Sequence, residues 1–247
     1  MSVLAIETAT KQLGVAIFDG GRILSSYELL EDYPHAVELP GAVTRVLKAA
    51  RTSLEQLDAI VIDIGPGSFT GLRIGLAFAK ALAFPSKKPL VSVPSLDVLA
   101  ANVPYAARAI CPILDAKQKN LYAARYHIKD GQTVKHTDYL LGPVDDILAQ
   151  LTEPAVFLGD GCAPYRDRIL ARCPTAEFAP QELWLPRATT LARLGAERFR
   201  AGQRNDSSTL VPLYLYPLDC SVRSADRPTS VLPSKIVHAS SAPSQSL

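Results

Sequence analysis

The pattern of apolar and polar residues changes period along this chain, and each change predicts an element. In the first part of the chain, apolar and β-branched runs predict strands at residues 3–7, 13–18, 22–29, 57–64 and 89–93. Helices are predicted at residues 34–51, 69–84 and 96–101. Asp19-Gly20-Gly21 predicts a hairpin turn. Val37 and Val43 belong to a core-facing stripe of the first helix, in which Pro40 predicts a kink or a late start.

The second part of the chain repeats this order of elements with weaker spacing and without detectable residue identity. Apolar runs predict strands at residues 109–114, 121–127, 134–140 and 155–158. Helices are predicted at residues 144–151, 166–171 and 191–201. The repeat predicts a duplicated α/β fold of two similar lobes, each with a mixed sheet flanked by helices, and a cleft between them.

Composition changes at two places and sets the expected boundaries. We expect a first lobe over residues 1–103 and a second over residues 104–217. From residue 218 the chain is rich in Ser, Pro, Ala and Arg and has few large apolar residues. Such a segment buries too little surface to offset the entropy of ordering it, so we expect residues 218–247 to be disordered.

Bulk composition narrows the functional classes. Of 247 residues, 48% are hydrophobic and 20% charged, with a net charge of +2, which is typical of a globular protein. Because basic residues are not clustered, any contact with RNA is expected to be indirect. The four cysteines form no Cys-x-x-Cys pair and are expected to be reduced. No export signal and no apolar run of about 20 residues is present, so we expect a cytoplasmic protein without a membrane partner.

A glycine-rich turn at Gly65, Gly67 and Gly71 joins an apolar strand to the helix at residues 69–84. It fails as a P-loop, because Leu72 and Arg73 follow the last glycine where Lys and Ser or Thr are needed. The dinucleotide-binding pattern and the nucleophile-elbow pattern of hydrolases also fail, because in each of them a required glycine is not at the right position. Two interpretations stay open: an anion site at a helix N-terminus, or glycines that only permit a tight turn and close packing.

The helix after this turn has almost no polar face. Small residues recur every four positions, at Gly71, Gly75, Ala79 and Ala83. A helix that is apolar all round is either buried or covered by a partner. We favour a surface that docks another protein, and the alternative is complete burial under the helix at residues 34–51.

Metal and catalytic candidates are weak. The four histidines are scattered, and no His-x-x-x-His pair exists. Zinc and iron sites need three or four converging donors, so we predict no metal site. Asp63 and Asp115 lie near strand ends, and Glu7 and Asp160 could reach the same cleft. Nothing couples these acids to a nucleophile, so no catalytic residue is predicted.

Three segments carry a resemblance to a known family: Leu4-Ala-Ile-Glu-Thr-Ala-Thr10, Gly65-Pro-Gly-Ser-Phe-Thr-Gly-Leu-Arg-Ile-Gly75 and Leu114-Asp-Ala-Lys-Gln-Lys-Asn-Leu-Tyr-Ala123. Together they resemble the TsaB family, also called YeaZ, over about residues 1–216, and the middle segment is the most specific. The resemblance implies the duplicated actin-like, sugar-kinase-like ATPase fold.

The resemblance also implies a function. The family acts with the catalytic subunit TsaD and the ATPase TsaE to transfer a threonylcarbamoyl group from its adenylate to the adenosine 3′ of the anticodon, in tRNAs that read codons beginning with A. Within this complex the family resembles a non-catalytic scaffold, whose first two helices pack on TsaD or, when alone, on a second copy. The residues expected at that interface are His35, Leu39, Val43, Val46, Phe69, Leu72, Arg73, Gly75, Leu76, Ala79 and Lys80.

The resemblance further implies a vestigial nucleotide cleft, expected at Glu7, Thr8, Gly65, Gly67, Ser68 and Asp115. Glu7 and the segment Asp115-Ala-Lys-Gln depart from the usual Asp and Asp-Ala-Arg-Arg. We therefore expect no intrinsic cofactor, and ATP or ADP stays open only at the partner interface. The alternatives are a stand-alone ATP-dependent enzyme of the sugar-kinase-like class and a metalloprotease. Against the latter, Leu39 stands where TsaD has the second histidine of its metal-binding pair.

Overall fold

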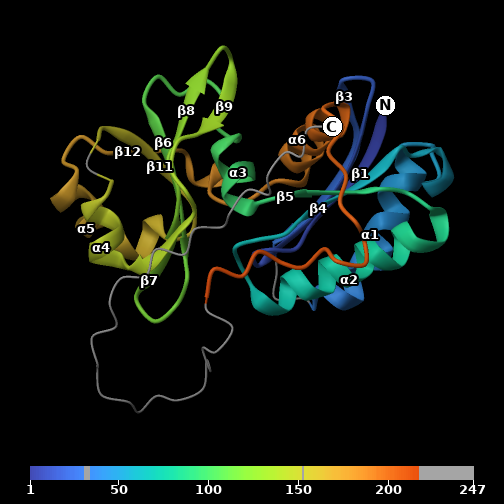
Figure 1. Cartoon of the computed structure of the whole chain (residues 1–247), viewed down its shortest axis with the longest axis horizontal. Coiled ribbons are helices and arrows are strands. Elements are labelled where there is room, and N and C mark those ends of the chain that lie inside the picture. Colours follow the sequence, from blue (N-terminus) through green and yellow to red (C-terminus); the bar gives the residue numbers. More distant parts are fainter. Residues whose placement is uncertain (31–33, 152, 217–247) are drawn as a thin grey trace, which may run out of the picture.

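The computed structural model describes residues 1–30, 34–151 and 153–216. The predicted disordered tail, residues 218–247, lies outside the described residues, as do Cys220 and His238. Figure 1 shows two sheets side by side, each flanked by helices. The division at residues 103 and 104 stays a prediction, with one correction given below.

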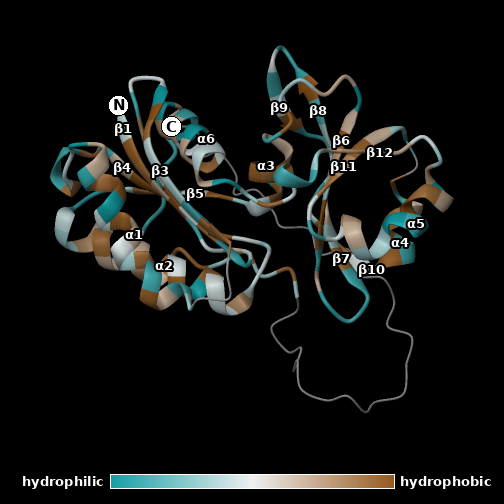
Figure 2. Ribbon diagram, turned by 180° about the vertical axis from the view of Figure 1, so that it is seen from behind, coloured by the Kyte–Doolittle hydropathy of each residue, from teal (hydrophilic) through white to brown (hydrophobic). Residues whose placement is uncertain are grey.

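The first sheet has strand order β3-β2-β1-β4-β5 among the described residues. Its strands are β1 (Ser2–Glu7), β2 (Gln12–Asp19), β3 (Arg22–Leu30), β4 (Ala59–Asp63) and β5 (Leu90–Val93). β1, β4 and β5 are parallel, and the hairpin strands β2 and β3 run antiparallel to their neighbours. The parallel strands are buried on both faces, which explains their unbroken apolar sequence (Figure 2).

Helices cover both faces of this sheet because successive side chains of a strand point to opposite sides. Leu4 and Ile6 of β1 pack toward α1 (His35–Ala49) and α2 (Phe69–Ser86). Val3 and Ala5 pack toward α6 (Ala188–Arg200) on the other face. The short helix η1 (Leu54–Gln56) precedes β4.

The position of α6 corrects the domain prediction. The boundaries from sequence place this helix in the second lobe, yet its apolar face packs on β1, β2 and β4 of the first sheet. Gly195 faces Val61 of β4 so closely that a Cβ on Gly195 would overlap the valine side chain. The helix joins the first sheet because Leu191, Ala192 and Ala196 complete a core whose other side is Val3, Ala5 and Val61.

The second sheet repeats the first, with order β10-β7-β6-β11-β12 in the described part of the chain. Its strands are β6 (Ala109–Asp115), β7 (Asn120–Ala123), β8 (Tyr126–Lys129), β9 (Gln132–Lys135), β10 (Leu140–Pro143), β11 (Ala155–Leu158) and β12 (Glu177–Phe178). As in the first sheet, a central strand pairs antiparallel with the next strand and parallel with the crossover strand. The predicted duplication is confirmed. The accompanying helices are α3 (Ser95–Ala100), α4 (Val144–Ala149), α5 (Cys162–Arg172) and η2 (Gln181–Leu183).

Two strands of the second half are each divided, contrary to prediction. Residues 121–127 form β7 and β8, and residues 134–140 form β9 and the start of β10. Arg125 causes the break: its N–H donates to Thr137 Oγ1, and its carbonyl accepts from the N–H groups of His136 and Thr137. The predicted late start of α1 at Pro40 is also wrong, since the helix begins at His35 and continues through Pro40.

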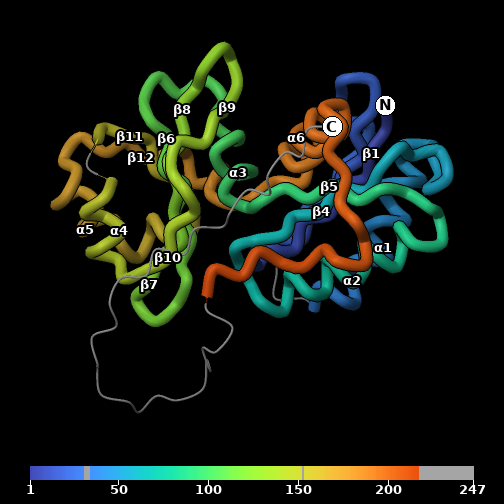
Figure 3. Tube along the Cα trace, viewed as in Figure 1, coloured from blue at the N-terminus to red at the C-terminus, as the bar shows by residue number. Residues whose placement is uncertain are grey.

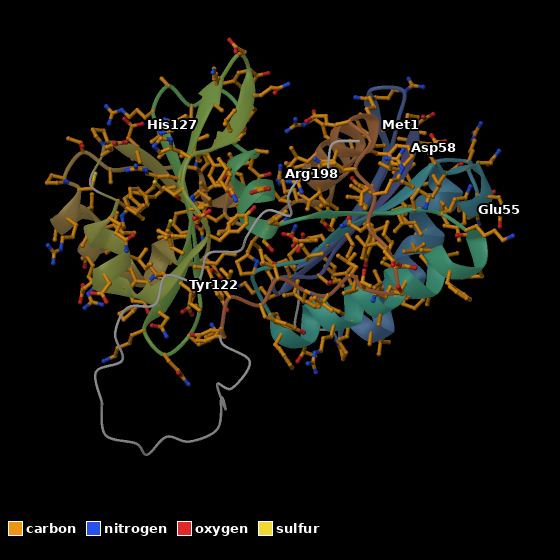
Figure 4. All side chains as sticks on the ribbon, in the orientation of Figure 1. Met1, Glu55, Asp58, Tyr122, His127 and Arg198 are labelled. Carbon is orange, nitrogen blue, oxygen red and sulfur yellow. The ribbon has the colours of Figure 1, made fainter. Side chains whose placement is uncertain are left out.

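Asp97 of α3 ties the two halves together. One of its carboxylate oxygens accepts from Tyr126 and Tyr139 at 2.6 and 2.8 Å, and the other pairs with Arg198 of α6. Figure 4 labels Arg198 between the two sheets. Burial raises the pKa of both phenols, so they remain donors at neutral pH. The α3 helix thus belongs by sequence to the first half and by packing to the second.

Candidate functional site

The carboxyl ends of β1 and β4 bring Glu7 and Asp63 together, and both are fully buried. Glu7 Oε1 accepts from the N–H of Ala9 at 2.7 Å. Asp63 Oδ1 accepts from the N–H of Gly65 at 2.7 Å and from Ser95 Oγ at 2.6 Å. Glu7 Oε2 and Asp63 Oδ2 are also buried and have no hydrogen-bond partner among the described residues, and the two carboxyl groups are close enough for the charge of Asp63 to raise the pKa of Glu7. One of the two must therefore carry a proton.

Burial first, and then the charge of Asp63, hold the pKa of Glu7 well above its usual range. Burial also raises the pKa of Asp63. Because solvent does not reach the two carboxyl groups, they are not positioned to act as an acid or a base on a substrate. Their position fits a structural role, in which they connect the ends of the two strands. Sequence reasoning placed both acids at strand ends but had no means of pairing them.

We expect the Glu7–Asp63 pair to make stability depend on pH. The folded pair keeps its proton to a higher pH than the unfolded chain does, so its contribution is complete below the ordinary carboxyl pKa and is lost as pH rises through the raised value. In the pH range in which the folded state holds one proton more than the unfolded chain, the free energy of unfolding falls by about 1.4 kcal/mol for each unit that the pH rises. Urea unfolding from pH 4 to pH 9 measures this.

The matched variant for this experiment is Glu7→Gln. Its amide can donate to Asp63 without a titrating proton, so the pH dependence of the unfolding free energy should become shallower above the ordinary carboxyl pKa than in the wild type. Comparing the two proteins cancels the titration of all other groups. Parallel curves for wild type and variant would contradict the shared proton.

The glycine turn is filled by the chain's own β1–β2 turn. A Cβ on Gly67 would overlap the Ala9 carbonyl, and one on Gly71 would overlap the Thr8 carbonyl. Ser68 N–H donates to the Ala9 carbonyl at 2.7 Å, and Ser68 Oγ accepts from Gly71 N–H at 3.2 Å. Two of the backbone N–H groups at this helix N-terminus, those of Ser68 and Gly71, are thus engaged within the protein. The geometry favours close packing over an anion site for these glycines.

The second half places its acids separately. Asp160 Oδ1 accepts from the N–H of Asp115 at 2.9 Å, and Asp115 pairs with Lys117 at 2.7 Å. Burial raises the pKa of Asp160, and Lys11 of the first half is among the nearby cations that oppose this rise. The four strand-end acids therefore form two pairs, one in each half. Of the six residues expected in a nucleotide cleft, Glu7, Thr8, Gly65 and Gly67 come together, Ser68 caps α2, and Asp115 lies in the other half.

Most of the residues expected at a partner interface lie inside this chain. Seven of them are buried in its own core: Leu39, Val43, Val46, Leu72, Gly75, Leu76 and Ala79. Their assignment as exposed contacts is corrected, because the small-residue side of α2 faces β1 and β4, where Gly75 abuts Thr8. The remaining four are reachable: Phe69 and Arg73 are exposed, and His35 and Lys80 are half-buried.

The opposite sides of α1 and α2 form an exposed apolar surface, called here the docking face. It consists of Val37, Pro40, Phe69, Arg73, Ala77, Ala81 and Phe84. Val37, Phe69 and Phe84 are 75%, 54% and 82% exposed. The guanidinium of Arg73 stacks on the Phe69 ring at 3.8 Å. The prediction that Val37 faces the core is wrong; its place opposite Leu39 and Val43 on the helix is the signal that could have found it.

Other features of the described residues lie away from the strand ends. Cavities of about 440 and 260 Å³ lie between α6 and the β8–β9 hairpin, one lined by Tyr105 and Arg193 and the other by Lys135 and Arg198.

No group of three His, Cys, Asp or Glu side chains placed to hold a metal occurs in the part of the chain described. Three cysteines are buried thiols, and burial raises the pKa of Cys111 to about 12. None of the described helices is long and apolar enough to cross a membrane.

Comparison with known proteins identifies relatives over most of the chain. Residues 31–218 match the family described as "TsaD: tRNA N6-adenosine threonylcarbamoyltransferase". The chain is 34% identical over 221 residues to the Bacillus subtilis tRNA threonylcarbamoyladenosine biosynthesis protein TsaB, covering 87% of this chain and 94% of that protein. The Escherichia coli protein of the same name is 29% identical over 222 residues, with the same coverage.

Solved structures give the same result. The Pseudomonas aeruginosa structure titled "YeaZ" superimposes with a TM-score of 0.74 at 26% identity, covering 87% of this chain and 99% of that chain. A second Pseudomonas aeruginosa structure, described as similar to peptidase YeaZ, gives a TM-score of 0.78 with the same identity and coverage. The likeness therefore extends over nearly the full length of both relatives.

Proposed function

The chain belongs to the TsaB family of tRNA threonylcarbamoyladenosine biosynthesis proteins, and from this premise we propose that it is a non-catalytic docking subunit of a threonylcarbamoyl-transfer complex. The observation that carries the proposal is the docking face on α1 and α2. The two helices that carry these exposed apolar side chains pack against each other, and a large apolar patch is rare on soluble proteins unless it contacts a partner. Phe84 and Val37 are the two most exposed large apolar side chains on it.

The partner in this proposal is a TsaD-like catalytic subunit, and a second copy of the chain takes its place in isolation. The docking face has the composition of a protein interface, with an apolar centre and a polar rim. At the rim, Glu38 of α1 accepts hydrogen bonds from Tyr27 at 3.0 Å and from Arg45 at 2.5 Å. A TsaE-like ATPase completes the assembly, and tRNA is contacted only indirectly by this subunit.

A non-catalytic role is supported by the state of the strand ends. Glu7 and Asp63 are sealed from solvent, and the glycine turn is occupied by Thr8 and Ala9. Among the described histidines, His35 lies in α1 and the other two lie at the β8–β9 hairpin. No intrinsic cofactor enters the proposal, and ATP or ADP would bind only at the interface with the partner. A metalloprotease finds no support, because Leu39 is buried in the core beside the single histidine of α1.

The experiment is co-expression of the full chain with the TsaD-family subunit and the TsaE-family ATPase of the same organism, followed by size-exclusion chromatography. We expect a stable complex, and loss of threonylcarbamoyladenosine from tRNA when the gene is deleted. Failure to form a complex together with intact tRNA modification would contradict the proposal. Turnover of Mg-ATP on an acceptor by the isolated chain would instead support the stand-alone enzyme.

A further inference from the structure

The β8–β9 hairpin extends from the second sheet and lies opposite α6 of the first half (Figure 3). Asp130 and Gly131 form its turn with φ angles of 51° and 73°, and two positive angles are typical of the type I′ turn that joins paired strands. Among the described residues, β9 pairs with β8 and with no other strand. One edge of β9 is therefore open.

The register of the hairpin shows which backbone groups face this open edge. In an antiparallel pair, successive residues of a strand direct their backbone groups alternately toward and away from the partner strand. His136 N–H donates to the Arg125 carbonyl at 2.7 Å, so His136 and Val134 face β8. Thr133 and Lys135 alternate with them, and their N–H and C=O groups therefore point away from β8. Each contributes one donor and one acceptor to the open edge.

The same two residues line a cavity between the hairpin and α6. Thr133 and Lys135 contribute to its hairpin side, and Leu194, Glu197 and Arg198 contribute to the side of α6. The cavity has a volume of about 260 Å³. A strand added to the β9 edge would direct every second side chain to the face that carries Thr133 and Lys135. An added strand would therefore gain backbone hydrogen bonds and side-chain burial together.

The charges around this cavity favour an acidic occupant. Its two carboxylates are already paired with arginines of α6, Glu197 with Arg193 at 3.1 Å and Asp97 with Arg198. Lys135 is exposed and forms no ion pair within the described part of the chain. A carboxylate on an added strand can therefore pair with Lys135 without displacing an existing ion pair.

A second copy of the hairpin is a poor occupant of this edge. Lys129 of β8 is exposed as well as Lys135 of β9, so two paired hairpins would gather lysines. Like charges on neighbouring strands are destabilising, and lysines on an edge strand commonly prevent such self-pairing. An acidic segment of a different protein replaces this repulsion with attraction.

We propose that the open edge of β9 binds an extended acidic segment of another protein, which pairs with Thr133 and Lys135 as an added strand and directs alternate side chains into the cavity beside α6. In this mode of recognition the backbone hydrogen bonds supply affinity, and Lys135 and the cavity supply the preference for sequence. The edge belongs to the second half, whereas the docking face lies on α1 and α2. The inference therefore does not depend on the docking proposed above.

The test titrates the full-length protein into a fluorescein-labelled peptide of alternating glutamate and valine, and follows fluorescence anisotropy. Thr133→Pro removes an N–H group on the open edge and leaves the hydrogen bonds to β8 in place, since proline is tolerated at such edge positions. Thr133→Val is the matched control, because valine keeps the N–H group and the β-branched shape. We expect Thr133→Val to bind like the wild type and Thr133→Pro to bind at least about tenfold more weakly. Equal binding by wild type and Thr133→Pro, or no binding by the wild type, would overturn the inference.

Two altered peptides test the same contacts on the wild-type protein. Methylation of the peptide's backbone N–H groups blocks strand pairing and keeps its side chains, and replacement of its glutamates by lysines reverses its charge. Each change should weaken binding at least about tenfold. If either altered peptide bound as tightly as the original, the added strand or its acidic character would be refuted.

Hydrogen exchange followed by NMR locates the peptide on the protein. The peptide at saturation should slow exchange of the Thr133 and Lys135 amides at least about tenfold, while the amide of Val134, which faces β8, changes little. Unchanged exchange at Thr133 and Lys135 would overturn the inference. Strong protection of both amides before peptide is added would also overturn it, because the chain itself or a second copy would then occupy the edge. Complex formation with the TsaD-family subunit is measured separately, so failure of one proposal leaves the other standing.

Discussion

Gly71→Ala is expected to destabilise the protein by about 3 kcal/mol, the upper part of the range for overpacking a rigid core. The added methyl group would overlap the carbonyl oxygen of Thr8, which is backbone and cannot rotate away. Relief requires moving the β1–β2 turn, which also carries Glu7 and accepts the Ser68 N–H bond through Ala9. Urea unfolding at neutral pH measures the loss.

The control is Gly41→Ala, which adds the same methyl group to a helical glycine of α1. The nearest atom to a Cβ there is the guanidinium nitrogen of Arg45 at 3.8 Å, the end of a flexible side chain. This variant should be more stable than the wild type by about 0.5–1 kcal/mol, because alanine is the better helix former. If Gly71→Ala were as stable as Gly41→Ala, the close packing of α2 on the β1–β2 turn would be refuted.

Phe84→Glu is expected to weaken association with the TsaD-family partner by about 100-fold, or about 2.7 kcal/mol, the effect typical of a hot-spot residue at an interface. Phe84 is 82% exposed in the isolated chain, so the substitution removes almost no internal packing. In the complex, however, a carboxylate would be buried among apolar groups without a partner charge. Calorimetric titration of the purified partner gives the dissociation constant, and thermal unfolding should show no change in the isolated variant.

Tyr105→Glu separates this effect from a general effect of surface charge. Tyr105 is 95% exposed and lies on the connection between the two halves, away from α1 and α2. It should bind the partner as the wild type does. If Phe84→Glu and Val37→Glu also bind like the wild type, the docking face is not the site of association. If all three variants lose binding, the charge and not the position is responsible.

The fold class could be predicted because local patterns and one specific segment agree. The actin-like, sugar-kinase-like architecture is confirmed by the matched strand orders of the two sheets and by the YeaZ structures. The segment from Gly65 to Gly75 is the most specific mark of the TsaB family, and its Gly67, Gly71 and Gly75 are required by contacts with Thr8 and Ala9. That close approach is a physical reason for the pattern.

The direction in which α2 faces could not be predicted. Helical periodicity groups Gly71, Gly75 and Ala79 on one side, but a small-residue side fits a sheet and a partner equally well. Tertiary structure turned that side toward β1 and β4 and left Phe69 and Phe84 exposed. The proposal of docking therefore survives on α2, although most of the residues first expected to make the contacts are core residues.

The sequence by itself determined the elements, the duplicated order of strands and the family, because these depend on local periodicity and on one segment with strict steric requirements. Tertiary structure decided which segments lie next to each other: the return of α6 to the first sheet, the burial of Glu7 beside Asp63, and the passage of residues 213–216 from Ile64 to Ala116. These contacts join residues tens to more than a hundred positions apart. Their free energies arise from burial and hydrogen bonding between distant segments, which no local pattern of residues encodes.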